Sequence, residues 1–137
     1  MISIESLSHL IGKPWVSGAD GPDAFDCWGL VKYIYRENLK IELPEFVGIS
    51  RKSLLDISRN INEEIVNSWQ EIFEPVHLCG ISMASNFRPY HVGLWIDDGN
   101  SSGVLHAHNG QGVMFQSLQS IKNSGMKNVA FFKFKKL

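Results

Sequence analysis

Hydrophobic residues follow two different periods along this chain. In the first half they recur every three or four positions, which is the spacing of the buried face of a helix. From residue 76 onward they alternate with other residues, which is typical of strands that have one face in a core. Helices first and strands afterwards predict an α+β domain, with N-terminal helices packed on an antiparallel sheet.

Three helical stretches are predicted in the first half. The first follows Ser3, whose hydroxyl can cap a helix. The second begins at Cys27 and extends to about Asn38, and a short extended piece follows it at residues 41–44. The third occupies residues 53–73, as one helix or two.

The second half is expected to form strands separated by clusters of Asn, Asp, Gly and Ser, which favour turns. A sheet of about five strands is predicted, covering residues 76–83, 91–96, 104–108, 113–118 and 129–134. A chain of 137 residues is long enough to bury one core. We therefore expect a single domain that spans residues 1–137.

The charge of the chain argues against nucleic acid as a partner. Its 13 Lys and Arg stand against 14 Asp and Glu, which gives a net charge of -1 and no basic field for a polyanion. No stretch approaches the roughly 20 apolar residues of a membrane span. No basic segment followed by an apolar run opens the chain. We therefore expect a protein made in the cytoplasm without a signal peptide and without a membrane span.

Cys27 is the first candidate for chemistry. Residues 21–23 form a turn sequence that cannot continue a helix, so the helix begins after them, with Asp26 as a natural N-cap. A thiol at the positive end of a helix, with an imidazole near it, can have a pKa between about 3.5 and 7.5 in place of roughly 8.5. Its thiolate would be a nucleophile, whereas the alternative is a small hydrophobic side chain in the core. The second cysteine, Cys79, lies in a predicted strand, and no disulfide is expected.

Three histidines lie on two neighbouring predicted strands. His91 lies on one strand, and His106 and His108 share a face of the next. If the turn between them is centred on Asp98-Gly99, His91 faces His106 directly, with β-carbons about 4.5 to 5.5 Å apart. A turn centred one residue later pairs His91 with His108 instead, so the register alone leaves both pairings open.

A cysteine at a helix start and paired imidazoles supply a nucleophile, a base and a group that orients the base. The same residues could in principle bind zinc. However, the one close ligand pair is His106-x-His108, and the chain has no CxxC or HxxxH spacing. We therefore predict neither a metal nor another cofactor. His9 and His77 are expected to be ordinary polar residues that face solvent.

Three motifs of the chain follow one another in a fixed order. They are residues 21–31 (GPDAFDCWGLV), residues 91–96 (HVGLWI) and residues 104–107 (VLHA). Together they resemble the NlpC/P60 family of papain-like cysteine peptidases, in the order and spacing of that family. The first motif is similar in particular to the version found in the tail assembly and tail-tip proteins of tailed phages.

The resemblance implies a role for each candidate residue. Cys27 is the nucleophile, His91 the general base and His106 the polar third residue of a Cys-His-His triad. This assignment favours the turn centred on Asp98-Gly99. His108 is then a bystander or a substrate contact.

The resemblance also implies a papain-like fold and a substrate. Family members hydrolyse an amide bond in peptidoglycan stem peptides, commonly between a γ-D-glutamyl residue and a diamino acid. The tail version implies action at the cell wall as part of a phage or prophage tail, with tail-tip proteins as partners. The alternative is a tail assembly protein that kept the fold with weak or absent hydrolysis. The presence of Cys27, His91 and His106 favours the enzyme.

Three further residues are expected near the substrate by the same resemblance. In relatives the Asp before the nucleophile contacts the free amine of the substrate, and this role falls to Asp26. Trp15 stands where the family often has a Tyr, and Trp28 where it often has a Ser. These two differences predict a bulkier and more apolar substrate pocket.

Overall fold

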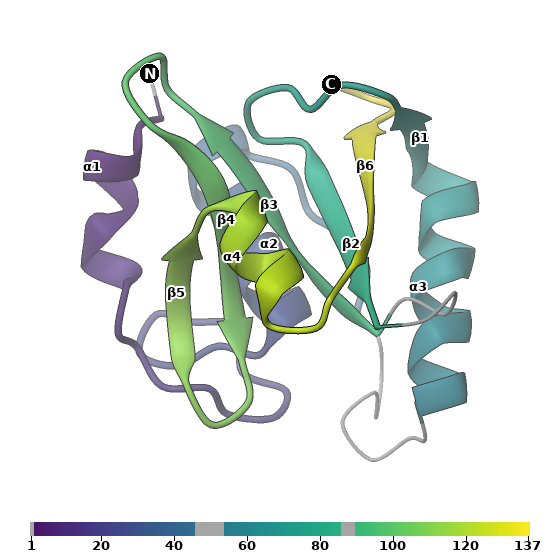
Figure 1. The fold of residues 1–137 in the computed structure, drawn as a ribbon, viewed down its shortest axis with the longest axis horizontal. Helices are drawn as coiled ribbons and strands as arrows, with labels where there is room; N and C mark the ends of the chain where they lie inside the picture. Colours follow the sequence, from purple (N-terminus) through teal and green to yellow (C-terminus); the bar gives the residue numbers. More distant parts are fainter. Residues whose placement is uncertain (1, 46–53, 86–89) are drawn as a thin grey trace.

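The computed structural model describes residues 2–45, 54–85 and 90–137 (Figure 1). Helices and one antiparallel sheet make up this part of the chain, which confirms the predicted α+β class. No helix of the described residues is both long and apolar enough to cross a membrane. In chain order the elements are α1 (Ile4–Leu7), the 3-10 helix η1 (Ser8–Leu10), α2 (Cys27–Ile34), the π-helix η2 (Tyr35–Leu39), α3 (Leu54–Ser68), β1 (Trp69–Ile72), β2 (Gly80–Ala84), β3 (His91–Asp97), β4 (Ser102–His108), β5 (Gly112–Gln116), α4 (Leu118–Asn123) and β6 (Asn128–Phe134).

The described part of the sheet has six strands in the order β1-β6-β2-β3-β4-β5, one more than predicted. Every neighbouring pair is antiparallel. Strands β2 to β5 follow one another as a meander, and β6 then returns across the sheet to lie between β1 and β2 (Figure 1). The candidate histidines on β3 and β4 therefore lie on neighbouring inner strands.

Hydrophobic side chains pack on both faces of the sheet. α2 covers one face, where it packs on β3 and β4, and α4 lies on the other face (Figure 1). Burial of each Leu or Ile side chain contributes roughly 1.5 to 3 kcal/mol to the stability of the fold. This packing therefore anchors Cys27, the first residue of α2, to the strands that carry the histidines. The core under α2 contains Leu30, Val31, Ile34, Leu94, Ile96, Leu105 and Ala107. The core beside α4 contains Ile81, Met83, Val104, Ile121 and Phe131.

The third predicted helical stretch contains the helix α3, but its last residues are not helical. Residues Trp69–Ile72 form the strand β1, which pairs with β6. Spacings of three and four cannot separate a helix from a strand over four residues. Aromatic residues favour strands, and here the Trp69 ring packs 5.5 Å from Tyr35 and 5.1 Å from Phe134 between ring centroids. Ser53, where the predicted stretch began, lies outside the described residues.

All five predicted strands are present, with ends that differ from the prediction by up to four residues. The differences in the first and the fourth strand have a visible cause. The first begins at Gly80 and not at residue 76, because Leu78 has a positive φ of 69°, which lies outside the β region. The fourth ends at Gln116 and not at residue 118, because the hydroxyl of Ser117 caps the start of α4. In both places a local backbone feature interrupts an alternating pattern.

The turn between β3 and β4 is one residue later than the family resemblance favoured. Asp97 pairs with Ser102, so residues 98–101 form a loop of four and not a turn of two. The Asp98 side chain closes this loop, because its Oδ1 accepts from the N–H groups of Asn100 and Ser101 at 3.0 and 2.9 Å. The predicted centre at Asp98-Gly99 is therefore wrong, and the alternative register is the observed one.

Candidate active site

The start of α2 is fixed by the Asp26 side chain. Its Oδ1 accepts from the Gly29 N–H at 2.6 Å, which confirms the predicted N-cap, and its Oδ2 accepts from the Gly18 N–H at 2.9 Å. The residue is only 7% exposed, and this burial is the main cause that raises the pKa of the Asp26 carboxyl. Both oxygens of Asp26 therefore hold the backbone around Cys27 in place.

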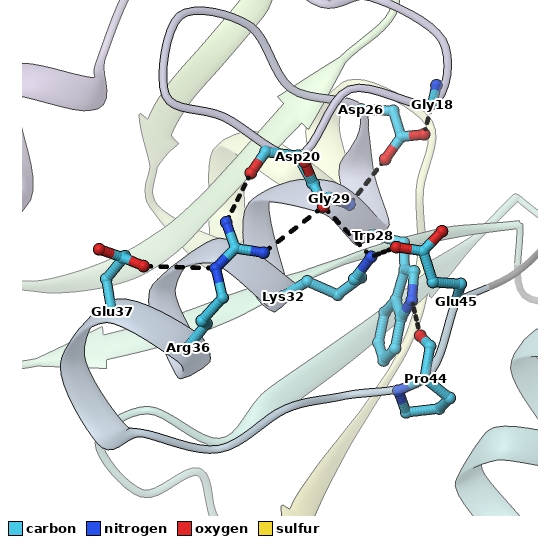
Figure 2. A network of polar contacts seen from close by, with 10 residues as sticks. All are labelled: Gly18, Asp20, Asp26, Trp28, Gly29, Lys32, Arg36, Glu37, Pro44 and Glu45. Carbon is cyan, nitrogen blue, oxygen red and sulfur yellow. Dashed lines mark hydrogen bonds and ion pairs between the residues drawn. The ribbon is translucent and has the colours of Figure 1, made fainter.

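A network of polar contacts ties the preceding loop to the outer side of α2 (Figure 2). The buried Lys32 bridges two carboxylates, with its Nζ 3.3 Å from Oδ2 of Asp20 and in contact with Glu45. The Arg36 guanidinium also donates to Asp20, both to its side-chain carboxylate and to its backbone carbonyl oxygen. A buried cation with two anionic partners is strongly held. The loop that precedes Cys27 is thus fixed at Asp20 as well as at Asp26.

Trp28 points toward the segment that follows η2. Its indole Nε1 donates to the Pro44 carbonyl oxygen at 2.8 Å (Figure 2), and the residue is 7% exposed within the core. Trp15, in contrast, is half-buried, and its backbone forms a bridge with Phe25 just before the cap. Substrate contacts of these two tryptophans stay predictions.

Cys27 is partly exposed and lies against the backbone of β3. The N–H groups of Val92, Trp28 and Cys27 itself point at its sulfur and favour the thiolate. Burial in low dielectric and the nearby Asp26 charge disfavour the thiolate more strongly, and together they raise the pKa of the Cys27 thiol to about 11. The predicted lowering of this pKa is therefore wrong, because the helix start is too poorly solvated.

The histidines form a chain of hydrogen bonds that starts at His91, the residue before Val92 in β3. Nε2 of His91 lies 2.7 Å from Nδ1 of His106, and Nε2 of His106 lies 2.7 Å from Oε1 of Gln116. The amide nitrogen of Gln116 donates in turn to the Ser120 hydroxyl at 3.0 Å. His91 and His106 are 5% and 1% exposed, so the contact between them is shielded from water.

His91 meets His106 across a diagonal and not as a direct partner. When the observed register is extended, His108 lies opposite His91 and Gly93 lies opposite His106. A Cβ on Gly93 would lie 2.9 Å from the Cβ of His106, so the glycine leaves room beside that ring. The His108 ring lies 5.2 Å from the His91 ring, and its Nδ1 donates to the Asn109 carbonyl oxygen at 3.0 Å. The predicted direct pairing is thus wrong, although the predicted contact with His106 is present.

Both rings of the pair are held neutral by their surroundings. Burial, followed by the proximity of His106 and His108, lowers the pKa of His91 well below 6.5. Burial also lowers the pKa of His106, although its bond to Gln116 raises that pKa in part. No hydrogen bond joins the Cys27 thiol to the His91 ring within the described ranges. At neutral pH the resting site therefore contains a neutral thiol and neutral imidazoles, and not an ion pair.

The other histidines lie away from this chain of bonds. His9 is exposed on η1. His77 does not simply face solvent, because its Nε2 donates to the Ile2 carbonyl oxygen at 2.6 Å and its Nδ1 accepts from the Asp97 N–H at 3.0 Å. It thereby ties the N-terminal segment to the end of β3.

The sequence interpretation missed Gln116 and Ser120. The signal for Gln116 was its position, because Met114 pairs with His106 and Gln116 lies two residues further on the same face of β5. Both cysteines are free thiols. Within the part of the chain that the structure describes, no three His, Cys, Asp or Glu side chains are grouped to hold a metal ion.

The sequence profile of the NlpC/P60 family matches residues 12–132 of the chain. The chain belongs to the NlpC/P60 family. It is similar to the probable endopeptidase YafL of Escherichia coli K12, with 46% identity over 44 residues. That match covers 31% of this chain and only 18% of YafL.

Two solved structures of NlpC/P60 domains share the fold. The NlpC/P60 domain of the peptidoglycan hydrolase SagA superposes with a TM-score of 0.59 at 20% identity, over 85% of this chain and 87% of that domain. A lipoprotein-like NLP/P60 protein of Staphylococcus aureus Mu50 gives 0.58 at 21% identity, over 93% of this chain and 39% of that protein. At these identities the likeness establishes the fold of the NlpC/P60 domain alone.

The raised thiol pKa predicts how this domain reacts with alkylating agents. Iodoacetamide should label Cys27 faster than Cys79, because Cys79 is only 2% exposed. Both thiols have a pKa raised to about 11, so each labelling rate should rise about tenfold per pH unit between pH 7 and 10. Peptide mass spectrometry of the labelled protein measures both rates. A Cys27 rate that is already constant at pH 7 would contradict the neutral thiol and indicate a thiolate.

Proposed function

We propose that this NlpC/P60 protein is a cysteine peptidase that hydrolyses an amide bond in the stem peptides of peptidoglycan. The observation that carries the proposal is the 2.7 Å contact between His91 and His106, next to a cysteine held against the backbone of Val92. Family membership supports it, as do the names of similar proteins, which include a probable endopeptidase and a peptidoglycan hydrolase.

In this proposal the thiol and His91 react as a neutral pair. As the Cys27 sulfur attacks the scissile carbonyl carbon, its proton moves to the His91 ring, so that a thiolate never accumulates at rest. The protonated ring then gives this proton to the leaving amine nitrogen as the carbon–nitrogen bond breaks. Water next attacks the thioester, and His91 takes up a proton of that water. As the carbon–sulfur bond breaks, His91 returns this proton to the sulfur, so that a carboxylic acid and the free thiol are released.

The start of α2 supplies the stabilisation of negative charge in this reaction. The first N–H groups of a helix have no partner within the helix, and the N–H of Cys27 points at the reacting sulfur. A donor of this kind at the oxyanion of the tetrahedral intermediate is worth roughly 3 to 4 kcal/mol in other enzymes. The hydrogen bonds that the Asp26 carboxylate accepts from the Gly29 and Gly18 N–H groups keep this donor in position.

The sequence motifs support a proposal for the particular amide bond that is cleaved. We propose the bond between a γ-D-glutamyl residue and a diamino acid, with Asp26 binding the free amine of the peptide from above the helix start. Trp15, Trp28 and His108 complete the substrate site in this proposal. The motif at residues 21–31 further supports delivery to the cell wall as part of a phage tail.

Digestion of purified sacculi and defined muropeptides tests this function. The expected products have masses that add up to the substrate plus one water, with a new amine on the diamino acid. A muropeptide that ends at the D-glutamyl residue has no such bond and should remain intact, which makes it the matched control substrate. A folded protein that releases no product from any muropeptide would overturn the peptidase proposal.

A further inference from the structure

We propose that Gln116 is a positioning residue that determines which ring nitrogen of His91 can accept the proton of Cys27. The inference rests on the proposed peptidase function and adds a residue and a direction of proton transfer to it. Among the described residues, the Gln116 side chain is hydrogen-bonded to His106 and Ser120 and not to Cys27 or His91. It acts through His106, to which its Oε1 is bonded at 2.7 Å.

The amide oxygen of Gln116 can accept a hydrogen bond but never donate one. His106 must therefore carry its proton on Nε2, the nitrogen that faces this oxygen. A neutral imidazole has one N–H, so Nδ1 of His106 is an acceptor. The 2.7 Å contact then requires His91 to donate from its own Nε2.

One consequence for His91 follows from this chain of bonds. With its proton on Nε2, the neutral His91 ring has its free lone pair on Nδ1. That nitrogen is the one not engaged by His106, so it is the base that receives the thiol proton. After the transfer, Nε2–H of His91 still donates to His106, and the positive charge forms next to an acceptor that Gln116 has already oriented.

The reverse arrangement of the same groups would disable the base. If the amide of Gln116 turned its NH2 group toward His106, Nε2 of His106 would have to accept and Nδ1 would have to donate. His91 would then accept on Nε2 and carry its proton on Nδ1, where no thiol proton could be received. The position of the Gln116 amide thus decides between an active and an inactive tautomer of a buried pair.

The surroundings of Gln116 hold this amide at the end of β5. Its Nε2 donates to the hydroxyl of Ser120 at 3.0 Å. Ser120 lies in α4, where its N–H donates to the capping hydroxyl of Ser117 at 3.1 Å. The neighbouring Ile121 is fully buried in the core beside α4, which anchors the short helix to the sheet. The chain of bonds therefore runs from α4 to the catalytic pair.

Nitrogen NMR of the histidine rings tests the inference without any substrate. In reduced wild-type protein above pH 7, His91 and His106 should both show a protonated Nε2 and an unprotonated Nδ1. Gln116→Glu should keep this pattern, because a carboxylate is an acceptor only. Gln116→Met, which has nearly the same shape but no amide, should give mixed tautomers. Protonated Nδ1 on His91 in the wild type would overturn the proposal.

Kinetics of muropeptide cleavage give the second readout. Gln116→Met should lower kcat by roughly 10- to 100-fold with little change in KM. This loss is smaller than the ~10,000-fold loss in kcat that follows when the residue bonded directly to a catalytic base is changed in other triads. Gln116→Glu should restore most of the rate. Gln119→Met is the matched control, because Gln119 is exposed on α4 and, among the described residues, its side chain bonds only to Asn123, so the rate of this variant should be that of the wild type.

The two readouts separate failure of the inference from failure of the proposed function. Correct tautomers in a protein that cleaves no muropeptide would reject the peptidase and leave the role of Gln116 in the tautomer chain intact. A Gln116→Met variant with wild-type tautomers and a wild-type rate would reject the inference and leave the peptidase intact. Folding of each variant is checked by its melting temperature and circular dichroism.

Discussion

Cys27→Ala and His91→Ala should each abolish the cleavage of muropeptides. In the proposed mechanism the thiol forms the bond to the substrate and His91 moves the proton in both directions, so neither group would work without the other. In an enzyme where such residues act as a unit, each single change costs about 10⁴- to 10⁶-fold and the double variant is hardly worse. The rates are measured by chromatography and mass analysis of the products, in parallel with the melting temperature.

Two further variants show whether the loss is specific. His106→Ala should retain a hundredth to a ten-thousandth of the rate, roughly, because in the proposed mechanism His106 orients the base and does not react. His9→Ala should be fully active, since His9 is exposed and far in the chain from the bonded histidines. A Cys27→Ala variant as active as the wild type would remove the thiol from the chemistry. If the losses of rate from the two single changes added up in the double variant, His91 and Cys27 would act independently and not as a catalytic unit.

The helix that carries Cys27 was predictable because its signals are local. The turn sequence at residues 21–23 stops any earlier helix, and Asp26 caps the next one with an oxygen 2.6 Å from the Gly29 N–H. The predicted end near Asn38 is matched by α2 and the π-helix η2 together. Backbone signals within a few residues of each other are sufficient for this element.

The register of the histidine strands was not predictable from the same kind of signal. An Asp-Gly pair fits a tight turn, but it also fits the observed loop, in which Asp98 accepts from Asn100 and Ser101. Asp98 is also held from outside the loop, because its Oδ2 accepts from the N–H of Ile4 at 3.0 Å. A contact 94 positions away in the sequence thus contributes to a choice that the local sequence leaves open.

The contact between two of the candidate site residues was predictable, whereas the electrostatics of the site was not. The motifs name Cys27, His91 and His106, and the structure brings the last two into contact. The pKa of Cys27 depends on a balance between burial with the Asp26 charge, which raise it, and backbone N–H groups of Val92 in β3 and of the helix start, which lower it. Burial is a property of the whole fold, so the sign of this balance cannot be obtained from the helix alone. Gln116 was missed for a related reason, because it enters the site across a second strand pair.

Gly29→Ala should destabilise the protein and displace the nucleophile, although alanine is the better helix former. Helix propensity alone predicts a gain of up to about 1 kcal/mol for this change in the first turn of α2. The new Cβ, however, would lie 1.9 Å from the Ala19 carbonyl oxygen and 2.9 Å from Oδ1 of Asp26. The Ala19 oxygen accepts from the Asp26 N–H at 2.9 Å, so it cannot move without releasing the loop that precedes Cys27.

The cost of this overpacking should exceed the gain in propensity. Forced backbone shifts in a packed core cost roughly 1 to 3 kcal/mol or more, and here the capping bond of Asp26 to Gly29 is disturbed as well. We expect a melting temperature lower by about 5 to 10 °C and a loss of muropeptide cleavage that persists well below that temperature. Gly80→Ala is the matched control, since its Cβ would meet the Trp69 ring at 3.3 Å and the Phe132 carbonyl oxygen at an ordinary contact distance of 3.7 Å, and a side chain can yield where a carbonyl cannot. A Gly29→Ala protein that is more stable than the wild type and equally active would show that the loop before Cys27 does not pack on α2 as closely as described.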